Sequence, residues 1–530
     1  MQPVIIPKTK FNVSDLLSMS KRNDVLLFIV IFVTVFSLTP LLVLGGVTVG
    51  FGLVLGIVVS LTIAALIVRW PLTGVYVVAV CAVLIEDAPL PTPILTDHLY
   101  IFYWPPGLEG LIERPIGFLF LFTLFMLVCH RLINRQKMLE GGALLLPFLL
   151  FLLCVAGGVL HGLTSGGDLK ITVVELRPFW YLFISYLLAY NLVTRVSHLR
   201  AFFWIVILAA GIKGLQGVYI YLVALHGNLT GIDTIMSHEE SFFFAALLVL
   251  TMLLCLHHQY RPQLYAALLV LPFVVIALVA NQRRADYIAL AVAIPVAWLL
   301  IFRVKRHARK RLFVIMLIGA VLSVGYVATF SHSSAGFAQP ARAIVSVFSP
   351  DNTDTRDSNS NLYRMIENDD LKYTVKQSPV FGLGFGKPYL QPIPLTSVFA
   401  GILAADMYYG YVPHNNIYWV WMRLGAIGFF VFWYLFGAMI VRGCLIARRL
   451  RDSYLQLVAI YIVAMVFMEI TVAFADYQLF LYRNVIYVGL LIGILMKLPA
   501  LDESNTSVGN VPTSCPHSVV ADGTRERKPE

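Results

Sequence analysis

The chain has 530 residues, of which 59% are hydrophobic and only 13% are charged, and its mean hydropathy is +0.81. A soluble core cannot bury so much apolar surface, so the composition excludes an ordinary soluble protein and indicates a polytopic membrane protein. The formal net charge of +10 is typical of cytoplasmic loops beside anionic lipid, so we expect membrane lipids, and no nucleic acid, as partners.

Apolar stretches of about 17 to 25 residues recur along most of the chain, after a polar and basic segment that does not resemble a cleavable signal peptide. Each is long enough to cross a hydrocarbon layer of roughly 30 Å as an α-helix. We predict an all-α protein with about 14 transmembrane helices, or 12 to 13 if the third and the last stretch do not cross. The spans are expected at about residues 25–44, 47–68, 71–86, 116–132, 143–160, 178–194, 201–225, 241–257, 263–280, 285–302, 312–330, 416–441, 455–475 and 478–496.

Lysine and arginine residues collect on alternate loops, most densely at residues 303–311 and 442–451, and this side is predicted to be cytoplasmic together with both termini. The opposite, periplasmic side receives one long loop that we expect to carry short helices. The predicted organisation is a cytoplasmic segment at 1–24, a transmembrane bundle at 25–330, the periplasmic loop at 331–415, the rest of the bundle at 416–497 and a disordered cytoplasmic tail at 498–530.

Several ionisable residues lie on the side predicted to be periplasmic. Arg177 begins the sixth span, where an arginine often snorkels to water. Arg283 and Arg284, in "NQRRADYIAL", are adjacent basic residues on the side where such residues are rare, although one of them pairing with Asp286 is an alternative. His238 precedes the eighth span. The two glutamates that follow it are interpreted as partners of the helix dipole.

The long loop contains two further candidates. Arg364 lies on a predicted surface helix that has Leu362, Met365 and Ile366 on one face, and it is either a ligand-binding or a solvated residue. "GLGFG", at residues 382–386, is either a backbone site for an anion or a flexible turn. No spacing typical of metal ligands is found, so we expect no metal and no other cofactor.

The most polar tripeptide of this region, His414-Asn415-Asn416, stands directly before a long apolar helix. Asn415 or Asn416 is expected to cap that helix, which places His414 at its positive end, where neutral imidazole is favoured. Neutral imidazole is what a general base requires. A capping loop that happens to contain a histidine is the alternative interpretation. Arginines on the same side suit a phosphate, and a lipid-linked diphosphate fits such a site.

The sequence "HNNIYWVWMRLGAIG" resembles the histidine-asparagine helix start of the O-antigen ligase and O-antigen polymerase superfamily. "SPVFGLGFG", "NQRRADYIAL" and "SHEESFFF" are similar to further features of that family, and together the matches extend from about Arg177 to Met439. The family consists of bacterial inner-membrane glycosyltransferases. Two departures are Arg423, where many members have an acid, and Arg283, which replaces a small residue.

The resemblance implies transfer of a glycan from undecaprenyl diphosphate to an acceptor glycan or glycolipid at the periplasmic face, without a metal. It implies that His414 is the base and that Arg284 holds the diphosphate. Arg283, Arg364, Arg177, His238 and Asn415 are then expected to bind substrate, and direct displacement would invert the anomeric centre. The sequence does not distinguish ligase from polymerase, although by analogy the long outer loop and about 14 helices lean slightly toward an exopolysaccharide polymerase.

A transporter or flippase for a lipid-linked or anionic solute is the alternative from another class, because such proteins place polar groups near the middle of the membrane. Lys213, beside Gly211, Gly214 and Gly217, lies in the seventh span. We interpret these glycines as a site of close helix packing, with Lys213 directed into an outer cavity. Glu469 is a possible counter-ion.

Overall fold

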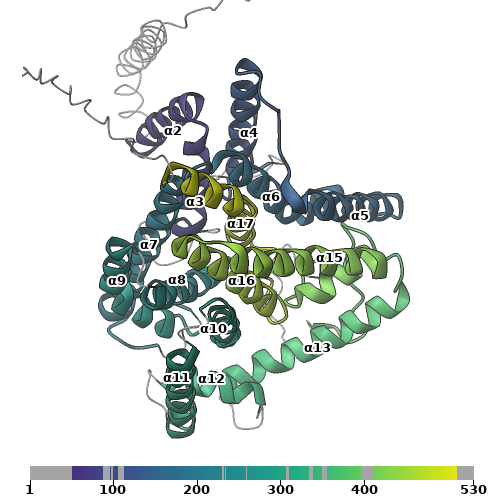
Figure 1. The fold of residues 1–530 in the computed structure, drawn as a ribbon. Coiled ribbons are helices and arrows are strands. Elements are labelled where there is room, and N and C mark those ends of the chain that lie inside the picture. The colour runs from purple at the N-terminus through teal and green to yellow at the C-terminus, as the bar shows by residue number, and fades with distance from the viewer. Residues whose placement is uncertain are drawn as a thin grey trace, which may run out of the picture.

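The computed structural model describes residues 51–86, 96, 99–104, 113–229, 232, 234–257, 260–305, 309–333, 338–348, 355–395 and 410–509. These residues form helices and connecting turns, without a β-strand among them (Figure 1). The predicted span at 25–44 and the predicted segment at 1–24 lie outside the described residues. The all-α fold predicted from the apolar stretches is therefore confirmed for the described part.

The helices follow the predicted apolar stretches closely. Their bounds are α2 Phe51–Arg69, α3 Leu72–Leu84, α4 Pro115–Ile133, α5 Leu145–Thr164 after a 3₁₀ turn η1 at Gly142–Leu144, α6 Leu169–Leu192, α7 Val196–Tyr219 continued by a π turn η2 at Ile220–Ala224, α8 His238–His257, α9 Arg261–Ala280, α10 Arg284–Val304, α11 Arg309–Phe330, α12 Gln339–Phe348, α13 Thr355–Gln377, α15 Asn416–Arg449, α16 Ser453–Ala473 and α17 Tyr482–Gly509. Eleven segments of the described chain are long and apolar enough to cross a membrane.

The centre of the bundle is formed by α6, α8, α16 and α17, whose apolar windows are 78 to 83% buried, whereas α11 at the periphery is 6% buried. The most extensive helix contact in the described part is that of α6 with α17, where α17 presents Gly489 and Gly493 to the backbone of α6. A Cβ atom at Gly493 would collide with the carbonyl oxygen of Tyr186. Small residues let two helix backbones approach in this way, which fixes α17 and the turn before it against the centre.

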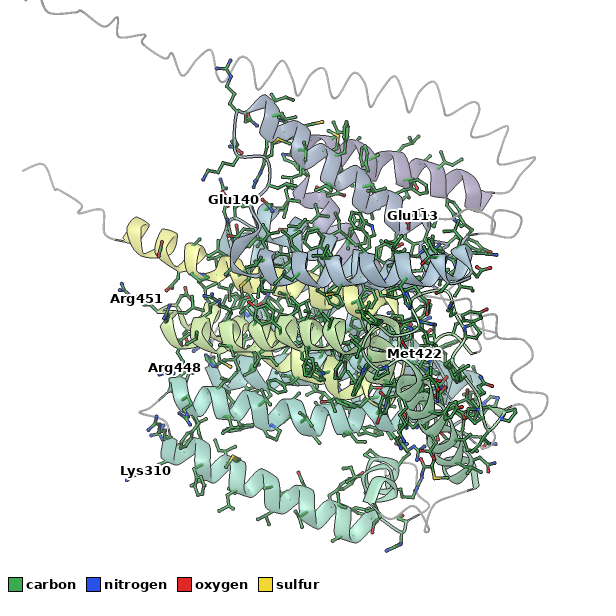
Figure 2. The ribbon with its side chains drawn as sticks, turned by 90° about the vertical axis from the view of Figure 1, so that its right-hand side faces the viewer. Glu113, Glu140, Lys310, Met422, Arg448 and Arg451 are labelled. Carbon is green, nitrogen blue, oxygen red and sulfur yellow. The ribbon has the colours of Figure 1, made fainter. Side chains whose placement is uncertain are left out.

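Basic residues lie at one end of the bundle. Figure 2 shows Arg448, Arg451 and Lys310 at that end, and Glu113 and Met422 at the opposite end. We call the first the basic end and the second the site end. This arrangement agrees with the alternation of charged loops along the sequence, from which we expect the basic end to be cytoplasmic.

Three predicted details differ from the structure. α6 begins at Leu169, because Asp168 caps it by accepting a hydrogen bond from the Ile171 amide (2.8 Å), so Arg177 lies inside α6 and not at its start. The long loop carries the 23-residue α13 and not only short helices. α17 continues to Gly509, past residue 498 where the tail was expected to begin, and residues 510–530 lie outside the described part.

Candidate active site

His414 lies at the head of α15 and contacts an acidic residue on α13. Asn415 caps α15 by accepting a hydrogen bond from the Tyr418 amide (3.1 Å), which confirms the predicted cap. Glu367 accepts a hydrogen bond from the His414 amide (3.0 Å) and lies 3.2 Å from its Nδ1. A second contact, from Nδ2 of Asn415 to Oδ1 of Asn368 (3.1 Å), joins the same two helices. The loop that carries His414 is therefore held firmly against α13.

The pairing with Glu367 determines what the imidazole can do. The Glu367 side chain is 2% exposed, whereas the His414 side chain is 31% exposed. A carboxylate that accepts Nδ1–H favours the tautomer whose lone pair is on Nε2, and it stabilises the imidazolium that forms when Nε2 takes a proton. His414 thus has the partner, the orientation and the exposure of a general base. Sequence reasoning missed Glu367.

A second cluster surrounds Asp476, in the turn between α16 and α17. Nη2 of Arg283 donates to Oδ2 of Asp476 (2.7 Å) and lies 2.5 Å from Nδ1 of His238, at the start of α8. Arg283 therefore pairs with Asp476, and not with Asp286 as the alternative interpretation proposed. Burial alone would raise the pKa of Asp476, but the charge of Arg283, followed by those of His238, His414 and Arg364, lowers it below its ordinary value.

The two clusters are neighbours. Tyr477, next to Asp476 in the chain, places its ring edge-on to the ring of His414 (5.5 Å between centroids) and near that of His238 (6.0 Å). A cavity of ≈ 50 Å³, large enough for a few water-sized atoms, is lined by Arg283, Arg284, Arg364 and Asp476, with Ser360 of α13. The structure thus brings together His414, His238 and three of the predicted arginines at the site end.

Arg177 occupies a different position. Its side chain is buried in α6, at 5% exposure, and Nη1 donates to the hydroxyl of Tyr482 at 3.3 Å. It is not among the residues that line the arginine cavity. The interpretation as an interfacial arginine that snorkels to water is wrong, because neighbouring helices cover the guanidinium. Tyr482 is the first residue of α17 and follows the Asp476 turn, so this hydrogen bond joins α6 to the start of α17.

The surface helix predicted around Arg364 is α13, but the three apolar residues expected on one face do not share one environment. In α13, Leu362 and Met365 are 39% and 58% exposed, and the buried face contains Glu367 and Asp370 besides Ile366. Oδ1 of Asp370 accepts a hydrogen bond from the Ile393 amide (3.2 Å). The buried face of α13 therefore combines apolar side chains, among them Leu371, with carboxylates that accept hydrogen bonds from the loops of the site end.

The glycine segment at 382–386 is neither an anion site nor a flexible turn, because its amides bond to the protein. The Gly386 amide donates to Oε2 of Glu175 (2.7 Å), and the Phe385 amide donates to the Gly158 carbonyl (3.2 Å). Gly382, Gly384 and Gly386 all have positive φ (71°, 77° and 78°), which only glycine adopts without strain. The segment is a rigid connection between α5, α6 and α15.

Arg423 secures this segment. Its side chain is fully buried with Glu175, and its Nε donates to Oε1 of Glu175 (2.7 Å). Its Nη atoms donate to the carbonyls of Gly384 (3.0 Å), Lys387 (2.6 Å) and Tyr411 (2.8 Å). We call this group the Arg423 clamp. These bonds join the segment before His414 to the helix after it, which explains why an arginine is found at position 423.

The Arg423 clamp is completed by a break in α15. Gly425 has φ 63° and ψ −172°, so the short segment that begins at Asn416 is set at an angle to the long span behind it. A Cβ atom at Gly425 would collide with the carbonyl of Val380. The kink therefore requires glycine, and it turns the head of α15 toward α13.

Lys213 belongs to a buried ionic network and not to an outer cavity. Its ammonium group contacts Glu86 and lies 3.3 Å from Oε1 of Glu240, all three with fully buried side chains. Glu240 also pairs with Arg483 (2.7 Å), so it is more than a partner of the helix dipole. Glu469 is not the counter-ion, because Glu86 and Glu240 fill that role. We call this group the Lys213 network.

The glycines beside Lys213 do mark close packing, as predicted. A Cβ atom at Gly211 would meet Val270 and one at Gly214 would meet Val274, both on α9. These contacts bring α7 and α9 together, which leaves Lys213 facing the interior of the bundle.

The family model described as O-antigen ligase matches residues 265–433, about a third of the chain. This segment contains Arg283, Arg284, Arg364 and His414, together with Glu367. It supports the resemblance to the O-antigen ligase and polymerase superfamily. No curated protein sequence matches the chain.

Proposed function

We propose that this multi-pass membrane protein, which carries an O-antigen ligase domain, transfers a glycan from undecaprenyl diphosphate to a sugar hydroxyl of an acceptor glycan or glycolipid. The observation that carries the proposal is the position of the His414–Glu367 pair beside an arginine-lined cavity, at one end of the bundle. A base and a cationic site side by side are what transfer from a phosphate leaving group to a hydroxyl needs.

In the proposed reaction, Nε2 of His414 removes the proton of the acceptor hydroxyl while its oxygen attacks the anomeric carbon. The bond from that carbon to the diphosphate oxygen breaks, and the diphosphate leaves with the electron pair. Glu367 stabilises the imidazolium. A single displacement of this kind inverts the anomeric centre.

The arginines have unequal roles in this proposal. Arg283 already donates to Asp476, so its charge is partly balanced. Arg284 and Arg364 approach the cavity from α10 and α13, and their guanidinium groups donate paired hydrogen bonds to the departing diphosphate. These groups supply the charge stabilisation without a metal. His238 and Asn415 orient Arg283 and the His414 loop, and Arg177 supports the turn that carries Asp476.

The membrane supplies the rest of the site. The polyprenyl tail lies among the apolar helices, and its diphosphate meets the arginines where those helices end. Because the basic end is predicted to be cytoplasmic, the site end is assigned to the periplasmic face of the bacterial inner membrane. The acceptor is either the lipid A core, for a ligase, or a second lipid-linked repeat, for a polymerase of O-antigen or exopolysaccharide.

The alternative of a transporter or flippase receives less support. It needs polar groups that line a central cavity around Lys213 and Glu469. Lys213 is instead fully buried and paired with two carboxylates, and Glu469 is fully buried, with Asn484 as its hydrogen-bond donor (3.4 Å).

The proposal is tested with the purified full-length protein, a polyprenyl-diphosphate oligosaccharide and an acceptor glycolipid. The wild-type protein is expected to produce transferred or longer glycan, and His414→Ala to reduce the rate by about 10²- to 10⁴-fold while the melting temperature is kept. Tyr418→Phe, at the same helix start, is the matched control and is expected to remain active. Turnover that survives in His414→Ala, or wild-type protein that leaves the oligosaccharide unchanged, contradicts the proposal.

A further inference from the structure

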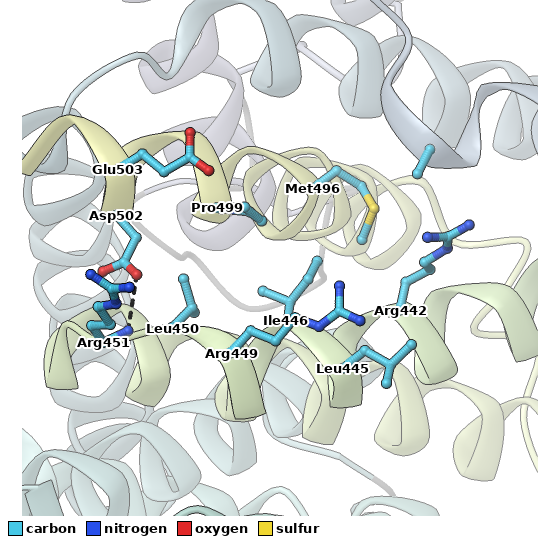
Figure 3. A pocket seen from close by; sticks show the side chains of 11 residues that line it. Arg442, Leu445, Ile446, Arg449, Leu450, Arg451, Met496, Pro499, Asp502 and Glu503 are labelled. Carbon is cyan, nitrogen blue, oxygen red and sulfur yellow. Dashed lines mark hydrogen bonds between the residues drawn. The ribbon is translucent and has the colours of Figure 1, made fainter.

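A cleft of ≈ 500 Å³ lies at the basic end, where α15 ends beside α17 and the turn η1 (Figure 3). Arg442, Leu445, Ile446 and Arg449 line it from α15, and their spacing of three, four and seven residues places them on one helix face. Arg451 lines it from the turn after α15. The cleft is remote from the candidate active site, which lies at the opposite end.

Basic residues outnumber acidic ones in the cleft, since Arg442, Arg449 and Arg451 line it together with Asp502 and Glu503. Arg442 and Arg449 form no hydrogen bond or ion pair with the other residues that the structure describes. Asp502 and Glu503 also line the cleft, but Asp502 already accepts hydrogen bonds from the amides of Arg451 (2.9 Å) and Asp452 (3.0 Å). Two guanidinium groups therefore face a common space, which suits an anion with several oxygen atoms.

The walls of the cleft are apolar. Ile446, Leu450, Met496 and Pro499 line it, and Leu445 is 37% exposed beside it. Val441, one turn from Leu445 on α15, is 58% exposed and continues this apolar surface along the helix. An occupant with a phosphate at the arginines and a hydrocarbon chain against Leu445 and Val441 matches both kinds of surface.

The position of the cleft relative to the hydrocarbon layer fits the same occupant. The part of α15 between the kink at Gly425 and Arg449 rises about 36 Å, slightly more than a hydrocarbon layer of roughly 30 Å. Arg449 then lies at the level of lipid phosphates, and Arg442, about 10 Å further in, reaches them by extending its long side chain. A soluble anion would gain nothing from the apolar wall.

We propose that this cleft binds the phosphate headgroup of an anionic phospholipid. Arg442 and Arg449 bind the phosphate, and the face of α15 around Leu445 and Val441 contacts an acyl chain. Basic pockets between helices at the cytoplasmic side are suited to such headgroups. The bound lipid fixes the end of α15 against α17.

The test uses native mass spectrometry of the full-length protein in detergent, titrated with phosphatidylglycerol or phosphatidylcholine. Wild-type protein is expected to bind phosphatidylglycerol in preference. Arg442→Gln combined with Arg449→Gln is expected to weaken phosphatidylglycerol binding about 30-fold, since each basic residue near a lipid surface strengthens binding about fivefold. Lys310→Gln combined with Arg448→Gln removes the same charge from the same end but outside the cleft, and is the matched control.

Three results overturn the proposal: equal binding of both lipids, an equal loss in the control variant, or displacement of the lipid by millimolar glycerol 3-phosphate, which would show a site for a soluble anion. A second measurement on the wild-type protein does not depend on the folding of variants. A phosphatidylglycerol analogue with a photoreactive headgroup is expected to label peptides that contain residues 442–451 or 496–503, and labelling confined to other peptides contradicts the assignment.

Discussion

The buried charges and the site-end charges of this protein are built differently. In the Arg423 clamp and the Lys213 network, acid and base are both fully buried. At the site end only the acids are buried, since Glu367 and Asp476 are 2% and 1% exposed while their basic partners, His414 and Arg283, are 31% and 15% exposed.

This difference separates structural charges from charges available to a substrate. A fully buried pair has all its hydrogen bonds within the protein and binds nothing further, but losing one partner leaves a buried charge behind. A partly exposed base that is paired with a buried acid is oriented by the protein and is still open to a ligand. Mutations in the first group should affect folding, and mutations in the second should affect catalysis.

The largest effect is expected for the Arg423 clamp. Arg423→Met removes the charged partner of Glu175 and the donor to three carbonyl groups, and we expect a loss of about 3–5 kcal/mol in stability, with little folded protein in the membrane. Thermal unfolding in detergent and the amount of protein in membranes measure this. Arg448→Met, at the exposed end of the same helix, is the control, and an equal melting temperature for the two variants would refute the clamp.

Arg284 should show the opposite behaviour. Arg284→Ala is expected to lower glycan transfer about 10²- to 10³-fold, because the departing diphosphate loses a donor, while the melting temperature changes little. Initial rates on the lipid-linked oligosaccharide measure this. Arg303→Ala, at the other end of α10, serves as control. Full activity in Arg284→Ala would remove this arginine from the diphosphate site.

Glu367 should have an intermediate effect, as a positioning residue. Glu367→Gln still accepts a hydrogen bond but no longer stabilises the imidazolium, so we expect a decrease of about 10- to 100-fold in kcat with KM for the donor nearly unchanged. Glu367→Asp should restore part of the rate. Asp369→Asn, on the exposed face of the same helix, should behave as wild type. A change confined to KM would argue against this role.

The smallest effect concerns the pH dependence of stability at Asp476. The pKa of this carboxyl is lower in the folded protein than its unfolded value of about 3.9. Its stabilising contribution is therefore complete above that value and is lost as the pH falls toward the folded pKa. Between pH 5 and pH 3 the wild type should lose about 1 kcal/mol more than Asp476→Asn, as measured by melting temperatures. Parallel curves for both proteins would contradict the ion pair.

What could be predicted from the sequence was local. Apolar length located the spans, and the cap at Asn415 placed His414 at a helix start, because both depend on residues close in the chain. The partners of the active residues could not be found in this way. Glu367 and His414 are 47 residues apart, and Arg283 and Asp476 are 193 apart, so only the packed bundle brings them together.

Periodicity was misleading where polar residues are buried. Leu362, Met365 and Ile366 were expected on one face of α13, but only Ile366 is buried, and it shares the inner face with Glu367 and Asp370. We predicted that Lys213 faces an outer cavity, because its partner Glu86, which follows α3, is distant in the chain. The acidic residue Glu86 was the available signal for a partner of Lys213.

The buried face of α13 links the two halves of the chemistry mechanically. Ser360, Arg364 and Glu367 are spaced by four and three residues and so lie on one face of α13. The same helix therefore carries Arg364, the proposed contact to the leaving group, and Glu367, the partner of the proposed base. A shift of α13 by one turn, or its separation from α15, would remove both residues from the site at once. In the proposed reaction, the position of this one helix therefore sets both the orientation of the base and the contact to the leaving group.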